Sequence, residues 1–159
     1  MKKVPLSKFQ YGMEAVSLLL LLYQGWYLLA AWDSIPDQIP THFNAAGIPN
    51  GWGGKETLPV LFGVCLLLNL LITVLSFFPK TWNVPVKITA ANEQFVYGNL
   101  SRMLSTIKLS IIGCFTYTNI RSAQGGSLGA WFIIIFLLAM FGSMVYYILK
   151  IVQGAKKFQ

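Results

Sequence analysis

Four long apolar runs decide what this chain can fold into. They cover approximately residues 15–32, 57–78, 103–120 and 128–149. A helix needs about 17 to 25 mainly apolar residues to cross the hydrocarbon core of a bilayer, and each run has that length. Only 11% of the side chains are charged, whereas a soluble domain carries about 25%. The sequence therefore predicts an all-α membrane protein, with one four-helix domain over residues 1–159.

The basic residues collect on one side of these runs. The formal net charge is +7, and Lys55 and Arg121 are the basic residues of the opposite side, together with Asp33, Asp37 and Glu56. Cytoplasmic loops of membrane proteins are rich in Lys and Arg, so we expect a membrane protein with both termini in the cytoplasm and loop 33–56 outside. Anionic lipid headgroups, and not nucleic acid, are the expected partners of the charge. The residues that carry this argument are Lys2, Lys3, Lys8, Lys80, Lys87, Arg102, Lys108, Lys150, Lys156 and Lys157.

The first apolar run also has the form of a signal sequence, but it is longer than the core of a cleavable one, about 7 to 15 residues. We therefore expect it to remain as the first span. Cys65 and Cys114 fall inside predicted spans and lack the spacing of a disulfide framework or a zinc site. They are expected to be small apolar packing residues.

The connection over residues 33–56 contains the stretch "IPTHFNAAGIPNGWGGK". Ile39 and Ile48 each precede a proline, which holds its predecessor in an extended conformation. Phe43 and Trp52 follow these isoleucines at equal spacing. We expect a rigid extended cap whose isoleucine and aromatic side chains pack on the helix ends, with "NAAG" and "NGWGG" as tight turns.

The longer stretch "IPDQIPTHFNAAGIPNGWGGK", directly after the first predicted span, resembles the bacterial multi-pass family named domain of unknown function 1648. That domain is also similar to the N-terminal part of SdpI-like toxin-immunity proteins. The resemblance covers roughly residues 15–65. It implies a multi-pass protein of the bacterial cell membrane. The best-described relatives protect the producing cell from a secreted membrane-active peptide and hold a repressor at the membrane. This chain is shorter, with four predicted spans, and its second half carries no such resemblance.

The outer loop also holds the candidate ligand-binding residues. For His42, the single histidine, three roles are open: a structural hydrogen bond to backbone, recognition of a peptide or lipid headgroup, and a metal or catalytic role with Asp37 and Glu56. One histidine rarely makes a zinc site, so we expect no metal, no cofactor and no enzymatic activity. Lys55 is expected to extend toward lipid phosphates or to pair with Glu56 or Asp37. The complete candidate set is His42, Phe43, Asn44, Asn50, Trp52 and Lys55.

Polar residues inside the predicted spans form a second candidate set: Gln24, Asn69, Thr73 and Lys108. Polar groups in a bilayer are costly and mark either a functional path or a packing contact. We expect interhelical hydrogen bonds, worth about 0.6 to 1.7 kcal/mol each. A polar groove along the third span is the alternative.

The cytoplasmic connection, residues 79–102, begins with two prolines, after which Thr89 can cap a helix that runs into the third span. A basic, partly apolar helix is expected to lie along the membrane surface or to extend from it. The alternative is a docking surface for a cytoplasmic protein.

Three functions remain open. The first is a binding and protection module, similar to the immunity relatives, whose outer loop recognises a toxin peptide or an envelope component. The second is a small transporter or lipid-handling subunit, and the third is a metal-dependent membrane enzyme. A homo-oligomer is compatible with each of them.

Overall fold

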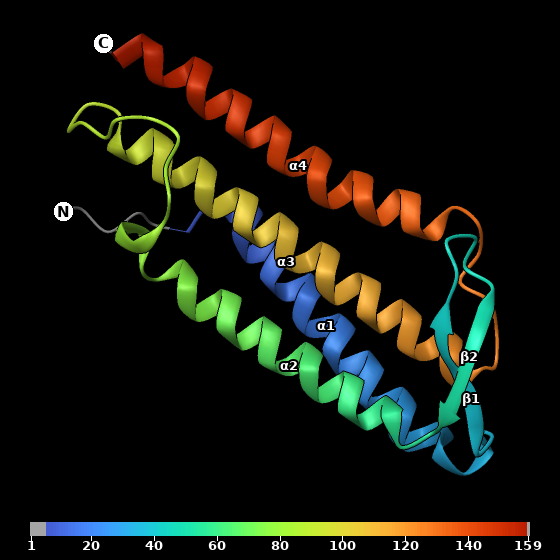
Figure 1. Ribbon diagram of the computed structural model, residues 1–159. Helices are drawn as coiled ribbons and strands as arrows, with labels where there is room; N and C mark the ends of the chain where they lie inside the picture. The colour runs from blue at the N-terminus through green and yellow to red at the C-terminus, as the bar shows by residue number, and fades with distance from the viewer. Residues whose placement is uncertain (1–5, 159) are drawn as a thin grey trace.

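The computed structural model describes residues 6–158 and has four long helices (Figure 1). Lys2 and Lys3 of the charge argument lie outside the described residues, as does the side chain of Lys80. Short 3-10 turns follow three of the long helices. The long helices are α1 (Lys8–Ala31), α2 (Thr57–Ser76), α3 (Glu93–Ala123) and α4 (Phe132–Ala155), and the turns are η1 (Trp32–Ser34), η2 (Pro79–Thr81) and η3 (Lys156–Phe158).

Three of the helical segments are long and apolar enough to cross a membrane: Lys8–Ser34, Thr57–Ser76 and Phe132–Phe158. The chain is therefore a mostly helical membrane protein, which is the part of the predicted all-α, four-span class that these helices confirm. Helix α3 is the longest helix, with 31 residues, but it is too polar to belong to this group. Its place in the bundle explains its composition.

Helix α3 is the inner helix of the bundle and packs against α1, α2 and α4 (Figure 1). Its buried side chains include Ser105, Lys108, Thr116 and Asn119. The other three helices expose rows of leucine, isoleucine and valine on their outer faces. Because lipid tails are as apolar as leucine, close packing and interhelical hydrogen bonds hold such helices together. A bundle with polar residues in its centre and apolar residues on its outside therefore suits a lipid environment.

Helix α1 begins earlier than its apolar run because polar residues cap it, whereas helix α3 begins earlier without a side-chain cap. Ser7 and Gln10 make a capping box at the start of α1. At α3, the predicted cap Thr89 lies in the turn before the helix, where its hydroxyl accepts from the Asn92 N–H at 3.3 Å and does not cap α3 itself. The helix then continues unbroken through Arg102, and this first part extends the bundle: Val96 and Leu100 pack with Ile151 and Ala155 of α4.

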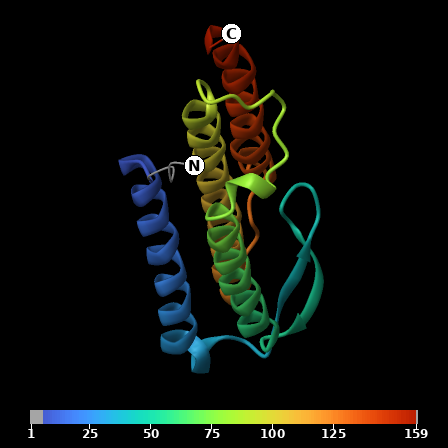
Figure 2. The ribbon, with the colours of Figure 1, turned by 90° about the vertical axis from the view of Figure 1, so that its left-hand side faces the viewer.

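The connection between α1 and α2 is a β-hairpin of β1 (Gln38–Phe43) and β2 (Pro49–Gly54). It reaches from the ends of α1 and α2 across to the loop between α3 and α4, at the end of the bundle away from the two termini (Figures 1 and 2). There the Leu128 N–H donates to the Gly47 carbonyl at 2.8 Å. The chain is therefore not all-α, since this small sheet caps one end.

The predicted packing of the loop on the helix ends is correct for the isoleucines that precede or belong to β1. Ile35 and Ile39 are buried in one cluster with Leu28 and Leu58. Ile48 and Trp52, in contrast, are 55% and 59% exposed, so the expectation that all these side chains pack on the helix ends is wrong. The reason is that β1 packs against α3, and its Ile39 against Leu58 of α2, while both exposed side chains follow the turn.

Candidate functional site

The tip of the hairpin is built by Asn44. Its side-chain oxygen accepts from the N–H groups of Ala46 and Ile48, both at 3.0 Å. Gly47 follows with a φ of +71°, a conformation that a side chain disfavours. The carboxamide oxygen that we considered for ligand binding is therefore used to close the turn, whereas Asn50 on β2 is exposed.

The glycines of "NGWGG" permit close cross-strand contact. A Cβ on Gly51 would lie 2.9 Å from the Cβ of His42, and a Cβ on Gly53 would lie 2.9 Å from the Cγ2 of Thr41. Side chains of β1 thus cover the backbone of β2. Much of the motif is consequently explained by the turn and the cross-strand packing of the hairpin itself.

His42 is exposed and pairs with Gly51 across the hairpin. Within residues 6–158, no three His, Cys, Asp or Glu side chains gather in a group that could hold a metal ion. The suggested combination of His42 with Asp37 and Glu56 is therefore not assembled in the described part of the chain. Phe43 pairs with Pro49 and is half-buried, and Trp52 pairs with Pro40.

Lys55 fastens the base of the hairpin to the end of α1. Its ammonium lies 3.1 Å from the Asp37 carboxylate, 3.4 Å from the Ile35 carbonyl and 5.4 Å from the centre of the Trp32 ring. Of the two carboxylates that the sequence offers to Lys55, Asp37 is the partner. Such a contact orients the hairpin more than it stabilises the fold, because Asp37 is exposed.

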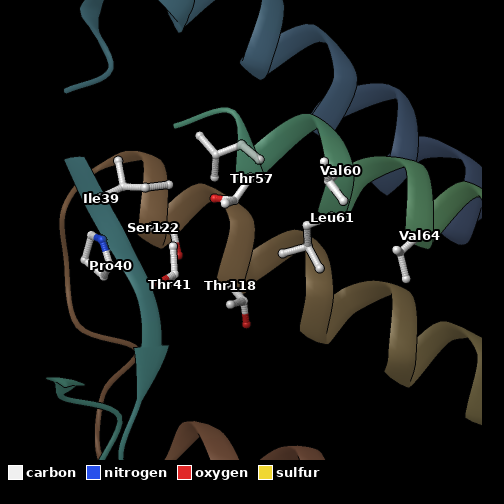
Figure 3. Close-up of a pocket in the computed structure, with 10 residues that line it drawn as sticks. Ile39, Pro40, Thr41, Thr57, Val60, Leu61, Val64, Thr118 and Ser122 are labelled. Atoms are coloured by element: carbon white, nitrogen blue, oxygen red, sulfur yellow. The ribbon is translucent and has the colours of Figure 1, made fainter. Parts of the chain in front are cut away.

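A cleft of about 300 Å³, which we call the outer groove, is lined by residues of β1, α2 and α3 (Figure 3). Its lining combines aliphatic side chains with hydroxyl groups from all three elements. Val60 and Val64 form a rim on the exposed face of α2, so the groove opens toward the side of the bundle. The lining residues are Ile39, Pro40, Thr41, Thr57, Leu58, Val60, Leu61, Val64, Thr118 and Ser122.

Sequence reasoning did not identify the outer groove. Its residues come from three separate segments, and Thr118 and Ser122 are ordinary polar residues near the end of an apolar run. The one signal was the family-like motif, which contributes Ile39, Pro40 and Thr41. The spacing of these residues in the sequence does not indicate that they lie beside α3.

Inside the bundle, Lys108 of α3 is 1% exposed and binds two other helices. Its ammonium contacts the Glu14 carboxylate of α1 and the Thr73 hydroxyl of α2, the latter at 2.9 Å. We call these three residues the Lys108 cluster. The carboxylate compensates the buried charge, which would otherwise be strongly unfavourable in an apolar environment.

Further polar contacts follow the same helix. Gln24 of α1 accepts a hydrogen bond from Thr116 at 3.0 Å, and the Asn119 side chain donates to the Leu58 carbonyl of α2 at 3.2 Å. The interhelical bonding expected for Gln24, Thr73 and Lys108 is therefore present. Asn69 differs, since its side-chain oxygen is buried without a hydrogen-bond partner in the described part of the chain.

A family model described as "Domain of unknown function (DUF1648)" matches residues 19–68, which include most of α1, the hairpin and the first half of α2. The match confirms the family resemblance of the outer-loop motif. An uncharacterized protein of Archaeoglobus fulgidus is 29% identical over 89 residues, covering 51% of this chain and 49% of that protein. The chain thus spans about half the length of this curated relative. No solved structure matches.

Proposed function

We propose that the chain crosses the cell membrane of a bacterium four times, with both termini in the cytoplasm and the hairpin outside. Helix α3 is the fourth crossing helix. Its composition supports this topology, because α3 faces three other helices and Glu14 compensates the charge of Lys108. The distribution of Lys and Arg along the chain supports the orientation.

We further propose that the protein is a binding and protection module without enzymatic activity. The outer groove carries this proposal. It combines an aliphatic floor, hydroxyl groups and an opening on the exposed face of α2, a composition typical of sites for mainly apolar ligands with a few polar groups. In the proposed topology, a ligand in the outer leaflet reaches this opening from the bilayer.

The proposed ligand is an apolar, membrane-active peptide. Strand β1 runs along the groove (Figure 3) and belongs to a two-stranded sheet, so one of its edges has no strand neighbour among residues 6–158. Such an edge can pair with the backbone of an extended peptide. The resemblance of the motif to immunity proteins agrees with this ligand class. An envelope lipid would use the aliphatic floor but would not pair with the strand edge.

Transport or lipid handling is the second candidate function. The observation in its favour is the buried polar path along α3, where the Gln24 side-chain nitrogen and the Asn69 side-chain oxygen lack hydrogen-bond partners within residues 6–158. Under this hypothesis, Asn69→Leu lowers activity while Thr118→Leu in the outer groove does not.

The test is survival of a sensitive bacterial strain during challenge with a panel of membrane-active peptides. Cells with the wild-type protein are expected to survive at least one peptide. Thr118→Leu, which fills the groove, is expected to remove protection, and Thr106→Leu, the same change on α3 outside the groove, is expected to keep it. Membrane abundance must be equal for all three proteins. Protection by Thr118→Leu at the wild-type level would contradict recognition in the groove.

A further inference from the structure

A second cleft, of about 500 Å³, lies at the end of the bundle that carries both termini. We call it the terminal cleft. Residues from α1, α3, α4 and the turn η3 line it, among them Gln10, Asn99, Arg102, Lys150 and Phe158. It is separate from the outer groove, which lies beside the hairpin at the opposite end (Figure 1).

The terminal cleft is positively charged. Arg102 of α3 and Lys150 of α4 both line it, and its lining contains no acidic residue. The ion pairs among residues 6–158 are Lys55 with Asp37 and Lys108 with Glu14. In the described part of the chain, therefore, no carboxylate compensates Arg102 or Lys150. The Lys150 ammonium lies 5.5 Å from the centre of the ring of Tyr146, one turn earlier on α4.

The cleft also has a buried acceptor that lacks a donor. Asn99 is 2% exposed, and its side-chain nitrogen donates to the Phe95 carbonyl at 2.8 Å. Its side-chain oxygen is buried without a hydrogen-bond partner within the described residues. A buried carbonyl oxygen without a partner is energetically costly, and a ligand hydroxyl would remove that cost.

We propose that the terminal cleft binds a phosphate ester that carries a hydroxyl group. Arg102 and Lys150 bind the phosphate oxygens, and the Asn99 oxygen accepts from the hydroxyl. A glycerol phosphate group has both features. It occurs in the headgroup of phosphatidylglycerol and in soluble glycerol phosphates, and basic pockets between membrane helices are suited to such headgroups.

The test uses the purified full chain in detergent and measures binding of phosphatidylglycerol and of phosphatidylcholine by native mass spectrometry. We expect a preference for phosphatidylglycerol. In Arg102→Gln/Lys150→Gln the affinity should fall about 30-fold, because each cation near a headgroup contributes about one kcal/mol. The matched control is Lys156→Gln/Lys157→Gln, which removes the same charge from exposed positions at this end and should keep the wild-type affinity.

Gly98→Leu separates binding in the cleft from general attraction between charges. Gly98 lines the cleft, and a Cβ there meets no atom within 4 Å, so the variant should fold and yet fill the site. Circular dichroism checks the helical content of every variant. Loss of binding in Gly98→Leu supports the proposal. Equal losses in the two charge variants, or wild-type binding by Gly98→Leu, would overturn it.

Competition identifies the source of the phosphate ester. If millimolar glycerol 3-phosphate displaces the lipid, the cleft also accepts the soluble compound. If it does not, the site requires the lipid. Either result, together with the Gly98→Leu loss, supports the shared chemistry, and the absence of any preference for phosphatidylglycerol would contradict it. Neither result depends on peptide protection.

Discussion

The hairpin and the interior of the bundle use polar residues in opposite ways. In the hairpin, polar and glycine residues act on near neighbours: Asn44 closes its own turn, and Gly51 admits the His42 side chain across the strands. In the bundle, Lys108 joins residues far apart in the sequence, on α1 and α2. A motif rich in Asn, Gly and Pro thus indicates local turn and strand structure. Single polar residues scattered through apolar runs indicate contacts between helices.

The largest effect is expected from breaking the Lys108 cluster. Lys108→Met removes the cation and leaves the partly buried Glu14 without its ion partner. The expected loss is about 3 to 5 kcal/mol of unfolding free energy, the usual cost of removing one partner of a buried pair. Thermal or denaturant unfolding in detergent measures it.

The double variant Glu14→Gln/Lys108→Met should recover much of that loss, since no uncompensated charge remains. Lys156→Met at an exposed position is the control. If Lys108→Met unfolds like the wild type, the ion pair does not join the helices.

The next effect concerns close contact in the hairpin. Gly47→Ala places a Cβ 2.5 Å from the Gly129 carbonyl oxygen and forces a residue with a side chain to a φ of +71°. Strain of this kind costs about 1 to 3 kcal/mol. We expect a lower unfolding temperature and faster protease cleavage in the hairpin. Gly63→Ala, where a Cβ meets no atom within 4 Å, is the control, and equal behaviour of the two variants would argue against the docked hairpin.

A smaller effect separates two asparagines of the motif. Asn44→Ala removes both hydrogen bonds in the turn and should cost about 1 to 2 kcal/mol, the usual value for one or two bonds. Asn50→Ala, at an exposed site, should leave the unfolding temperature unchanged. The comparison fails if Asn50→Ala is the more destabilising variant.

The smallest effect is expected for a single interhelical hydrogen bond. Thr116→Val removes the donor to Gln24 and keeps the shape of the side chain. The expected loss is about 0.6 kcal/mol, the average for such bonds in a membrane protein. Unfolding in detergent should reveal it against Thr118→Val, a neighbouring change outside this bond. A loss well above this value would mean that the Gln24 contact organises the bundle.

The sequence predicted the helices well because apolar length is a strong signal. The predicted start of the second run, at residue 57, coincides with the start of α2. The start of α1 was missed because its polar residues, such as Gln10, are buried against another helix. The helix that was predicted to run from Thr89 into the third span is present as the first part of α3. The strands were missed because proline and glycine, which are frequent in this hairpin, are unfavourable in strands.

The candidate site was predicted less completely. Lys55 and Asp37 are close in sequence, and their pairing was one of the expected outcomes. Glu14 lies directly before the first predicted span, residues 15–32, so its bond to Lys108 was not expected. The outer groove and the terminal cleft are each lined by residues from separate segments of the chain. The spacing of residues in the sequence does not indicate which segments lie together in the fold.

The central claim is that the outer groove receives a membrane-active peptide. The most direct measurement is photocrosslinking in living cells, with benzoylphenylalanine at residue 118 in the groove and, as the reference, at residue 110 on the same helix. The account predicts a crosslinked peptide from residue 118 alone. Equal crosslinking from both residues, or protection of cells against a peptide that does not crosslink to residue 118, would contradict it.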